Sequence, residues 1–237
     1  MTVEAVNISK RYFRRTGSAN YFYAVHPTSL TIAPGEMIVL TGRSGSGKTT
    51  LLNMLSGLLM PSEGRVRFDD TDLYGLNDKA LSRLRSGKIG IVPQGRSAVD
   101  TLTVLENILL PARLGGGVLP EEAAAKWMER LGIRHLQDVR PAELSGGELR
   151  RMAIARALAQ EPEVLFADEP TGDLDDENTC LVLSAFKSFT REQKKAVFMV
   201  THENGAFQYA DRVFRMENGQ LTGFSEQGCS ANTVPQF

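Results

Sequence analysis

The sequence predicts an α/β protein, and three observations support this fold class. An apolar run of strand type at residues 37–40 leads into a glycine-rich loop at 42–49 and then into a helical pattern at 50–57. A second apolar run, at 164–167, ends in the acids Asp168 and Glu169, as a buried parallel strand can. The chain has 237 residues, of which 42% are hydrophobic, enough for the core of one large α/β domain.

The glycine-rich loop fits the pattern G-x-x-x-x-G-K-[ST] in the strand–loop–helix setting that this pattern needs. Glycines let the backbone close around an anion, and the following helix adds the positive end of its dipole. Lys48 then reaches the β- and γ-phosphates of a nucleotide, and the Thr49 hydroxyl is a Mg²⁺ ligand. The residues predicted to bind nucleotide here are Gly42, Ser44, Gly45, Ser46, Gly47, Lys48, Thr49 and Thr50. The alternative is a glycine-rich turn that binds nothing.

Composition and charge limit the function classes. The net charge of −1 gives no overall attraction to nucleic acid or to an anionic membrane. Cys180 and Cys229 are far apart and have no Cys or His at metal-ligand spacing, which favours a reducing compartment. Because there is no apolar run of about 18 residues and no signal-peptide pattern, we expect a cytoplasmic protein. Any membrane spans would belong to another chain.

The first part of the chain predicts antiparallel strands. Short strands are expected at 2–9, 21–25 and 30–33, with a polar turn at 16–20. Tyr12 lies between them and is either a stacking platform for a nucleobase or an ordinary aromatic on a sheet surface; local sequence favours the second. A later strand at 88–94 ends in Gln94, which can hold a metal-bound water.

Residues 101–160 predict a mostly helical insertion. A helix is expected from 103, a glycine run at 115–117 breaks the chain, and a further helix carries Trp127 into the core. Ser145 is a good N-cap, and Glu148 three residues later completes a capping box. The segment is either only a well-made helix start or a second phosphate-binding surface.

The last third of the chain predicts two buried strands with polar residues at their carboxyl ends. Asp168 is placed for a Mg²⁺ shell, and Glu169 is placed to take a proton from an attacking water. A strand is expected at 196–200, and His202 follows its carboxyl end. His202 either donates a hydrogen bond to a γ-phosphate or has only a structural role. An acidic turn at 171–175 and a hairpin at 213–221 are also expected.

In chain order, these motifs resemble those of the ATP-binding-cassette (ABC) ATPases. Residues 42–49 correspond to the Walker A loop, Gln94 to the Q-loop and 144–148 to the signature. Residues 164–169 correspond to the Walker B strand, 173–175 to the D-loop and His202 to the switch histidine. The resemblance covers about residues 2–222. Segments 83–90 and 142–172 look most like the branch that includes the ATPases of lipoprotein release, macrolide and antimicrobial-peptide export, and bacterial cell division.

The resemblance implies a RecA-like P-loop NTPase core with an antiparallel β subdomain and a helical subdomain, in a single domain over residues 1–237. The implied divisions are the β subdomain with the first half of the core (1–94), the helical subdomain with the signature (95–160), the second half of the core (161–224) and a polar tail (225–237).

It also implies an ATPase subunit that closes as a homodimer on Mg·ATP and drives a separate integral-membrane permease from the cytoplasmic face. The implied metal ligands are Thr49, Gln94 and Asp168, and the implied catalytic residues are Glu169, His202, Gln94 and Lys48. In the head-to-tail dimer, Ser145 and Gly147 of one subunit contact the γ-phosphate held by Lys48 of the other. The implied nucleotide-binding residues outside the Walker A loop are Tyr12, Ser145, Gly146, Gly147 and Asp175.

The sequence departs from the family pattern at two residues and one segment. Glu148 stands where Gln is usual, and a capping box would turn its carboxylate away from the phosphate. Pro93 precedes Gln94 where a bulky apolar residue is commoner. Residues 95–100 differ from the apolar segment that forms the family's groove for the membrane partner.

Three other functions compete with this reading. A soluble ABC-type ATPase of DNA repair or translation would carry zinc modules, long coiled coils or a second cassette, which the sequence lacks, and no nucleic acid partner is expected. A P-loop kinase would leave segment 144–148 without a role. A nucleotide-bound regulator without hydrolysis is disfavoured by Glu169 and His202.

Overall fold

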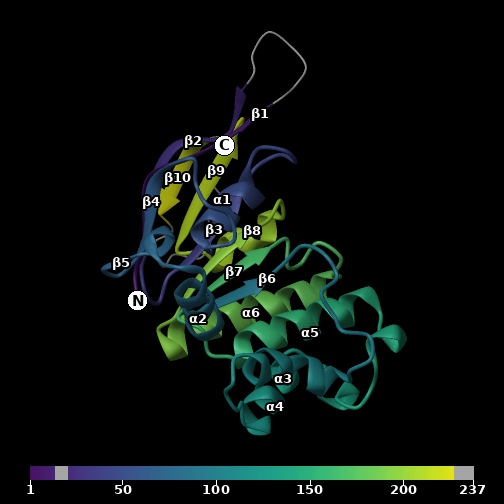
Figure 1. Cartoon of the computed structure of the whole chain (residues 1–237). Coiled ribbons are helices and arrows are strands. Elements are labelled where there is room, and N and C mark those ends of the chain that lie inside the picture. The colour runs from purple at the N-terminus through teal and green to yellow at the C-terminus, as the bar shows by residue number, and fades with distance from the viewer. Residues whose placement is uncertain (14–20, 227–237) are drawn as a thin grey trace.

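The computed structural model describes residues 1–13 and 21–226, which form two β-sheets flanked by helices (Figure 1). The larger sheet has six strands in the order β10-β9-β3-β8-β7-β6. Its strands are β3 (Met37–Thr41), β6 (Ile89–Val92), β7 (Val164–Asp168), β8 (Ala196–Val200), β9 (Arg212–Glu217) and β10 (Gln220–Glu226). Neighbours from β9 to β6 run parallel, while β10 pairs antiparallel with β9. The predicted α/β class and the predicted hairpin are therefore confirmed.

The helices follow the predicted order along the chain. They are α1 (Lys48–Leu55), α2 (Asp78–Lys88), α3 (Val104–Leu114), α4 (Glu121–Arg130), α5 (Gly146–Ala159) and α6 (Asp176–Gln193). Short 3-10 turns lie at Leu73–Gly75, Arg134–Leu136, Pro141–Glu143 and Asn204–Tyr209. Of these α-helices, none is both long and apolar enough to cross a membrane in the part of the chain that the structure describes.

Strand β3 shows how the large sheet separates two apolar layers. Met37 and Val39 belong to the cluster formed with α3 to α6, whereas Ile38 and Leu40 belong to the cluster formed with α1 and the smaller sheet. All four side chains are fully buried. Successive side chains on a strand point to opposite faces, so a continuous apolar run is what a strand covered on both faces requires.

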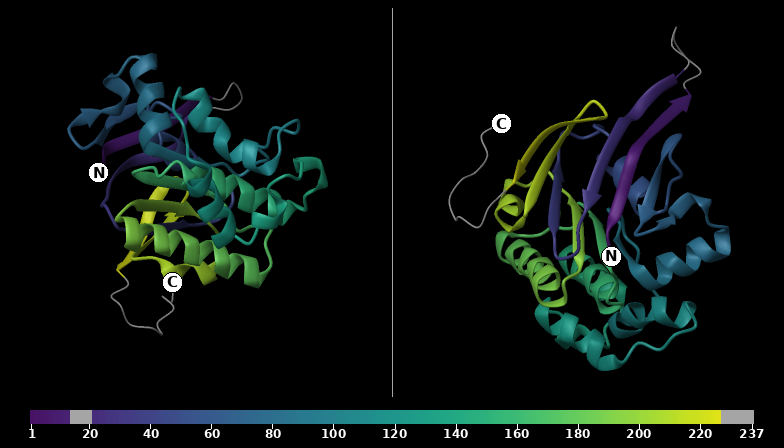
Figure 2. Two further views of the ribbon diagram at one scale, coloured as in Figure 1. Left: turned by 90° about the horizontal axis from the view of Figure 1, so that it is seen from below. Right: turned by 90° about the vertical axis from the view of Figure 1, so that its left-hand side faces the viewer.

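The smaller sheet is antiparallel, with strand order β2-β1-β4-β5. Its strands are β1 (Val3–Phe13), β2 (Tyr21–Ile32), β4 (Glu63–Phe68) and β5 (Thr71–Asp72), and β1 and β2 run side by side as a long ribbon (Figure 2). The prediction of separate strands at 21–25 and 30–33 is wrong, because both belong to β2. Pro27 is tolerated within β2 since this strand lies at the sheet edge, where a missing N–H costs little. The turn predicted at 16–20 lies outside the described residues.

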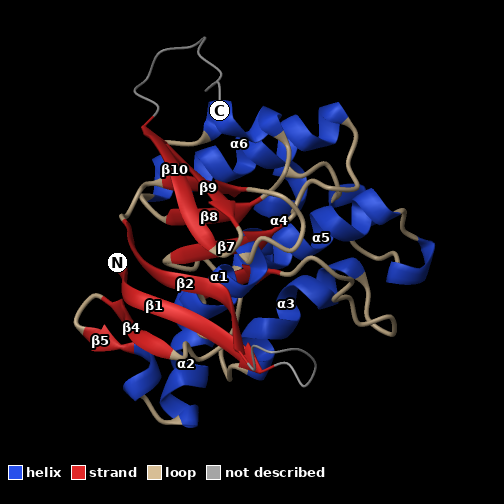
Figure 3. Ribbon diagram, turned by 90° about the horizontal axis from the view of Figure 1, so that it is seen from above, coloured by secondary structure: helices blue, strands red, loops and turns tan. Residues whose placement is uncertain are grey.

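The predicted helical insertion forms its own layer. Helices α3 and α4 both pack against α5, and Figure 1 shows these three helices below the strands of both sheets. Figure 3 shows the same helices in blue and the strands in red from above. Trp127 is 1% exposed, and its ring meets that of Phe189 on α6 edge-on, with centroids 6.0 Å apart. This contact joins the helical layer to α6, the helix beside the large sheet.

Candidate active site

A cleft of about 1040 Å³ opens at the carboxyl edge of the large sheet, beside the loop that joins β3 to α1. Parallel strands present their carboxyl ends at one edge, which is where ligands bind in open α/β sheets. The predicted residues that line this cleft are Gly42, Ser44, Gly45, Gly47, Lys48, Thr49, Thr50, Gln94, Glu169 and His202. The fold therefore brings together side chains from segments that are far apart in the sequence.

The backbone of the loop at 42–49 requires its glycines. Gly42, Gly45 and Gly47 have φ values of +152°, +76° and +105°, in the region that other residues rarely adopt. A Cβ on Gly42 would lie 2.2 Å from the carbonyl oxygen of Met216, and one on Gly47 would lie 2.2 Å from that of Ala24. The loop can therefore follow this tight path only without side chains at these positions.

Lys48 begins α1 and is 8% exposed. Its Nζ donates to the carbonyl oxygens of Gly42, at 2.7 Å, and Arg43, at 3.0 Å, so the ammonium group is folded back onto the loop that contains it. Ser46, also predicted to bind nucleotide, has a buried hydroxyl without a hydrogen-bond partner among the described residues and is not part of the cleft lining.

Asp168 is the last residue of β7 and is 3% exposed. Burial raises the pKa of its carboxyl group, and a hydrogen bond from Thr49 and the charges of Lys48 and Arg150 offset only part of this effect. Its Oδ1 is buried and has no partner among the described residues. A buried carboxylate oxygen without a donor, next to a threonine hydroxyl, is the kind of hard oxygen pair that Mg²⁺ binds.

Glu169 follows directly and adopts a left-handed backbone conformation, with φ of +48°. Its N–H donates to the carbonyl oxygen of Val200 on β8 at 2.9 Å, and its Oε2 lies 2.9 Å from Nδ1 of His202, which donates to it. Such a conformation is strained for a residue with a side chain, and strain of this kind persists where surrounding contacts enforce it. The bend turns the Glu169 side chain into the cleft beside the histidine.

Helix α5 begins at the predicted capping box, which is confirmed. The Ser145 hydroxyl accepts from the Glu148 N–H at 3.3 Å, and the Glu148 Oε2 accepts from the Ser145 N–H at 2.7 Å and hydroxyl at 2.8 Å. These bonds lower the pKa of Glu148 and turn its carboxylate back to the helix start, as expected for this departure from the family pattern. Ser145 and Gly146 are exposed, and Gly147 is half-buried.

The structure does not bring the α5 tip to the cleft of its own chain. Ser145 and Gly147 are absent from the cleft lining, while Gly146 lines a separate hollow of about 150 Å³ that also contains Gln94. An exposed helix N-terminus with free N–H groups is an anion site. Within residues 1–13 and 21–226 of one chain, the α5 tip does not line the cleft beside the loop at 42–49.

Two other predicted nucleotide-binding residues lie outside the cleft lining. Tyr12 on β1 is 38% exposed, and its ring centroid is 5.9 Å from that of Phe22, which does line the cleft. Asp175 caps α6 by accepting from the N–H of Asn178 at 2.8 Å, and bonds from Asn178 lower its pKa. Neither side chain contributes to the cleft as it stands in one chain.

Sequence reasoning missed several residues of the cleft. They are Phe22, Tyr23, Ala24, Arg43, Arg150, Gly172, Asp173, Asn218 and Gly219. The aromatic run at 21–25 indicated only strand structure, and Asn218-Gly219 indicated only the hairpin turn. The close approach of Gly47 to Ala24 explains why β2 forms a wall of the cleft, and no local pattern carries that information.

This loop on this edge of a parallel sheet defines a P-loop nucleoside triphosphatase. The family model described as "ABC transporter" matches residues 25–172, more than half of the chain. The chain therefore belongs to the ABC transporter family, and it is an ATP-binding cassette with ATPase activity.

Known relatives agree with this family. The chain is 41% identical over 199 residues to a lipoprotein-releasing system ATP-binding protein, LolD 2, of Chlorobaculum tepidum, covering 81% of each chain. It is 40% identical over 197 residues to the macrolide export ATP-binding/permease protein MacB of Syntrophobacter fumaroxidans, covering 81% of this chain and 28% of that one. The dimeric, post-hydrolysis ATP-binding cassette MJ0796, bound to ADP and Pi, superposes with a TM-score of 0.88 at 32% identity, covering 95% of this chain and 99% of that chain.

Proposed function

We propose that the cleft binds ATP with Mg²⁺ and that this chain hydrolyses it as the motor subunit of a transporter. The observation that carries the proposal is the glycine cradle at 42–49, which folds around Lys48, hydrogen-bonds through Thr49 to Asp168 and shares its cleft with Glu169. The loop N–H groups and the start of α1 bind the phosphates. The Lys48 ammonium group exchanges its bonds to the Gly42 and Arg43 carbonyls for bonds to the β- and γ-phosphates. Phe22 and Tyr12 form the aromatic side on which adenine stacks.

The metal-binding role falls to Thr49, Asp168 and Gln94. The unpartnered Oδ1 of Asp168 and its raised pKa support this role, because a bound cation stabilises the ionised carboxylate that burial disfavours. Bound Mg²⁺ supplies charge neutralisation on the phosphates. Gln94 lines the cleft two residues after β6, and its amide oxygen would bind the metal or a metal-bound water.

The hydrolytic role falls to Glu169, with His202, Gln94 and Lys48. Glu169 orients and deprotonates the attacking water, while its hydrogen bond with His202 holds its carboxylate in place. His202 and Lys48 then stabilise the charge that develops on the γ-phosphate. Loss of that phosphate removes the contacts that hold the closed state, so the state opens.

Two copies of the chain complete each site. The α5 tip, with Ser145, Gly146 and Gly147, is exposed and lies outside its own cleft, which suits a head-to-tail homodimer in which it meets the γ-phosphate held by the partner copy. Asp175 stands at the same interface. Support comes from MJ0796, whose solved cassette is dimeric.

A separate integral-membrane permease is the proposed partner, and the chain acts on the cytoplasmic face of that membrane. Support comes from relatives named for lipoprotein release and for macrolide export with a fused permease. The proposed division of the chain follows the same family pattern: β subdomain and first half of the core (1–94), helical subdomain (95–160), second half of the core (161–224) and a tail (225–237), of which 227–237 lie outside the described residues.

The test is phosphate release from ATP by the purified full chain without any acceptor molecule. We expect release that needs Mg²⁺ and is lost in Lys48→Ala, followed by stimulation when a reconstituted permease of the lipoprotein-release class is added. Release that requires a small-molecule acceptor would instead identify a kinase. Stimulation by nucleic acid but not by permease would support the soluble DNA-repair or translation alternative.

A further inference from the structure

We propose that Arg150 is a positioning residue for hydrolysis, which holds Gln94 at the cleft and ties it to the helix that carries Ser145. This inference rests on the proposed function and adds to it a residue that acts through another one. Arg150 lies on α5, five residues after Ser145, and its side chain lines the cleft.

The contacts of Arg150 are made with the backbone on either side of Gln94. One terminal nitrogen donates to the carbonyl oxygen of Pro93 at 2.6 Å, and the other donates to that of Gln94 at 2.8 Å. Arg150 is 8% exposed, so both bonds are sheltered from water. A planar guanidinium that donates from both terminal nitrogens holds two acceptors in a fixed plane, a geometry that an ammonium group does not impose.

The charge of Arg150 is balanced by the acidic edge of the large sheet. Burial lowers the pKa of Arg150, and the carboxylates of Asp173, Asp168 and Glu169 oppose that effect. Asp168 is proposed to bind the metal, and Glu169 is proposed to activate water. The guanidinium is thus a buried cation that sits between the Q-loop backbone and the reacting end of the cleft.

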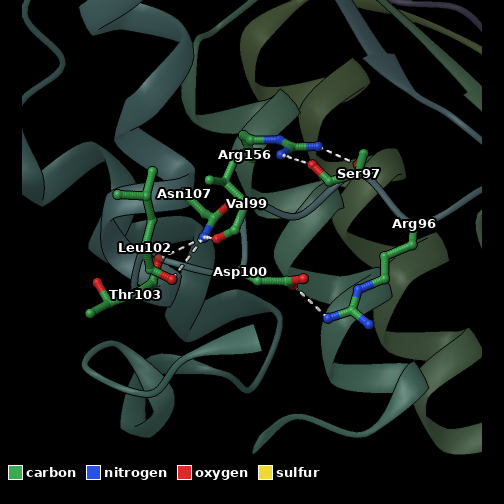
Figure 4. Close-up of polar contacts among 8 residues, drawn as sticks. All are labelled: Arg96, Ser97, Val99, Asp100, Leu102, Thr103, Asn107 and Arg156. Atoms are coloured by element: carbon green, nitrogen blue, oxygen red, sulfur yellow. Dashed lines mark hydrogen bonds and ion pairs between the residues drawn. The ribbon is translucent and has the colours of Figure 1, made fainter. Parts of the chain in front are cut away.

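A second arginine of α5 also binds the segment that follows β6. Arg156 donates to the carbonyl oxygen of Ser97 at 2.7 Å and also to its hydroxyl, as Figure 4 shows. Beyond it, the fully buried amide of Asn107 donates to the carbonyls of Val99, Leu102 and Thr103 (Figure 4). The connection from β6 to α3 is therefore fastened to the helical layer by buried side chains at several points.

Arg150 links the α5 tip, proposed to meet the γ-phosphate of the partner copy, to Gln94, proposed to bind the metal in this chain's own cleft. Because Arg150 bonds to the peptide groups of Pro93 and Gln94, a shift of α5 moves Gln94 by a similar amount relative to Asp168 and Glu169. Engagement of the α5 tip by a second copy would then set the position of Gln94 in the cleft of the first. A residue acting in this way affects turnover through Gln94 and has little effect of its own.

The experiment is a double-mutant cycle of Arg150→Met and Gln94→Ala in the full chain, with steady-state ATP hydrolysis as the readout. We expect Arg150→Met to lower kcat by about 10- to 100-fold, as a misplaced catalytic group does, with KM for ATP changed by less than about threefold. In the Gln94→Ala background, the same substitution should lower kcat by less than about twofold.

Arg156→Met is the matched control, since it removes a buried arginine from the same helix that holds Ser97 rather than Gln94. We expect it to lower the melting temperature as Arg150→Met does but to change kcat by less than about threefold. If Arg150→Met shows no cooperative unfolding transition, the cycle is run with Arg150→Lys, which keeps the charge but cannot hold both carbonyls in one plane.

Two results would overturn the inference. One is an unchanged kcat in folded Arg150→Met, and the other is a loss of kcat that multiplies fully with that of Gln94→Ala, which would mean that Arg150 acts independently. A wild-type chain that releases no phosphate from Mg·ATP would count against the proposed function instead, so the two failures are separable.

Discussion

The replacement of Gly47 by alanine tests whether the phosphate-binding loop depends on the close approach of two backbone segments. Gly47 has φ of +105°, and a Cβ there would lie 2.2 Å from the Ala24 carbonyl oxygen of β2 and 3.1 Å from Cε of Met216. Because the nearest atom belongs to the backbone of a strand, the overlap cannot be relieved by a side-chain rotation. The loop or β2 must move.

The matched control is Gly45→Ala in the same loop. Gly45 has φ of +76° but no atom within 4 Å of an added Cβ, so only the backbone conformation is strained. The left-handed conformation costs a residue with a side chain about 1–2 kcal/mol, and forced overlap in a packed region adds about 1–3 kcal/mol. We therefore expect Gly45→Ala to lower the free energy of unfolding by about 1–2 kcal/mol and Gly47→Ala by about 2–5 kcal/mol.

The assay is urea unfolding followed by circular dichroism in the absence of nucleotide, so that loss of ligand binding does not enter the result. Equal destabilisation by Gly45→Ala and Gly47→Ala would refute the argument, because it would mean that the contact with Ala24 adds nothing beyond backbone strain. A Gly47→Ala variant with wild-type stability would refute the described loop conformation as well.

Three further predictions follow from the acidic edge and from the start of α5. Glu169→Gln should lower the rate of phosphate release by about 100-fold or more while fluorescent-nucleotide titration shows retained ATP binding; wild-type turnover would remove Glu169 from its role. Asp168→Asn should raise the free energy of unfolding of the nucleotide-free chain at pH 7 by about 1 kcal/mol, since it neutralises a buried carboxylate with an unpartnered oxygen. The same substitution should abolish the Mg²⁺ dependence of nucleotide affinity. A less stable variant would contradict the stability argument. Because the pKa of Glu148 is lowered, its ionised carboxylate stabilises the folded chain at neutral pH, and this stabilisation is lost as the pH falls through the folded-state pKa. Ser145→Ala should raise that pKa part of the way back in an NMR titration and lower the free energy of unfolding by about 1 kcal/mol at pH 7. An unmoved pKa would contradict the capping box.

The sequence was most informative where structure depends on neighbouring residues. The loop at 42–49 is specified by glycines, a lysine and a threonine within eight positions, and the cleft lining contains most of them. The capping box at Ser145 and Glu148 is equally local and is confirmed. Apolar runs such as 164–167 also predict buried strands without knowledge of their partners, because burial on both faces leaves no polar alternation.

The sequence was least informative where structure depends on contacts between distant segments. Phe22 enters the cleft because β2 passes against Gly47, and Arg150 enters it because α5 lies beside the end of β6. The length of β2 was also misjudged, since an edge position that tolerates Pro27 is a property of the assembled sheet. Positions of this kind follow from topology, which local patterns do not contain.

The central claim is that two copies of this chain close on ATP through the exposed tip of α5, and the molar mass in solution tests it most directly. Gly146 suits this test because an added Cβ would meet no atom within 4 Å, so Gly146→Asp places a carboxylate at the tip without disturbing the single chain. Light scattering of Glu169→Gln with Mg·ATP should give twice the 26.0 kDa of one chain, and the same protein carrying Gly146→Asp should remain at 26.0 kDa. A single-chain mass for Glu169→Gln, or a dimer that Gly146→Asp leaves intact, would contradict the account.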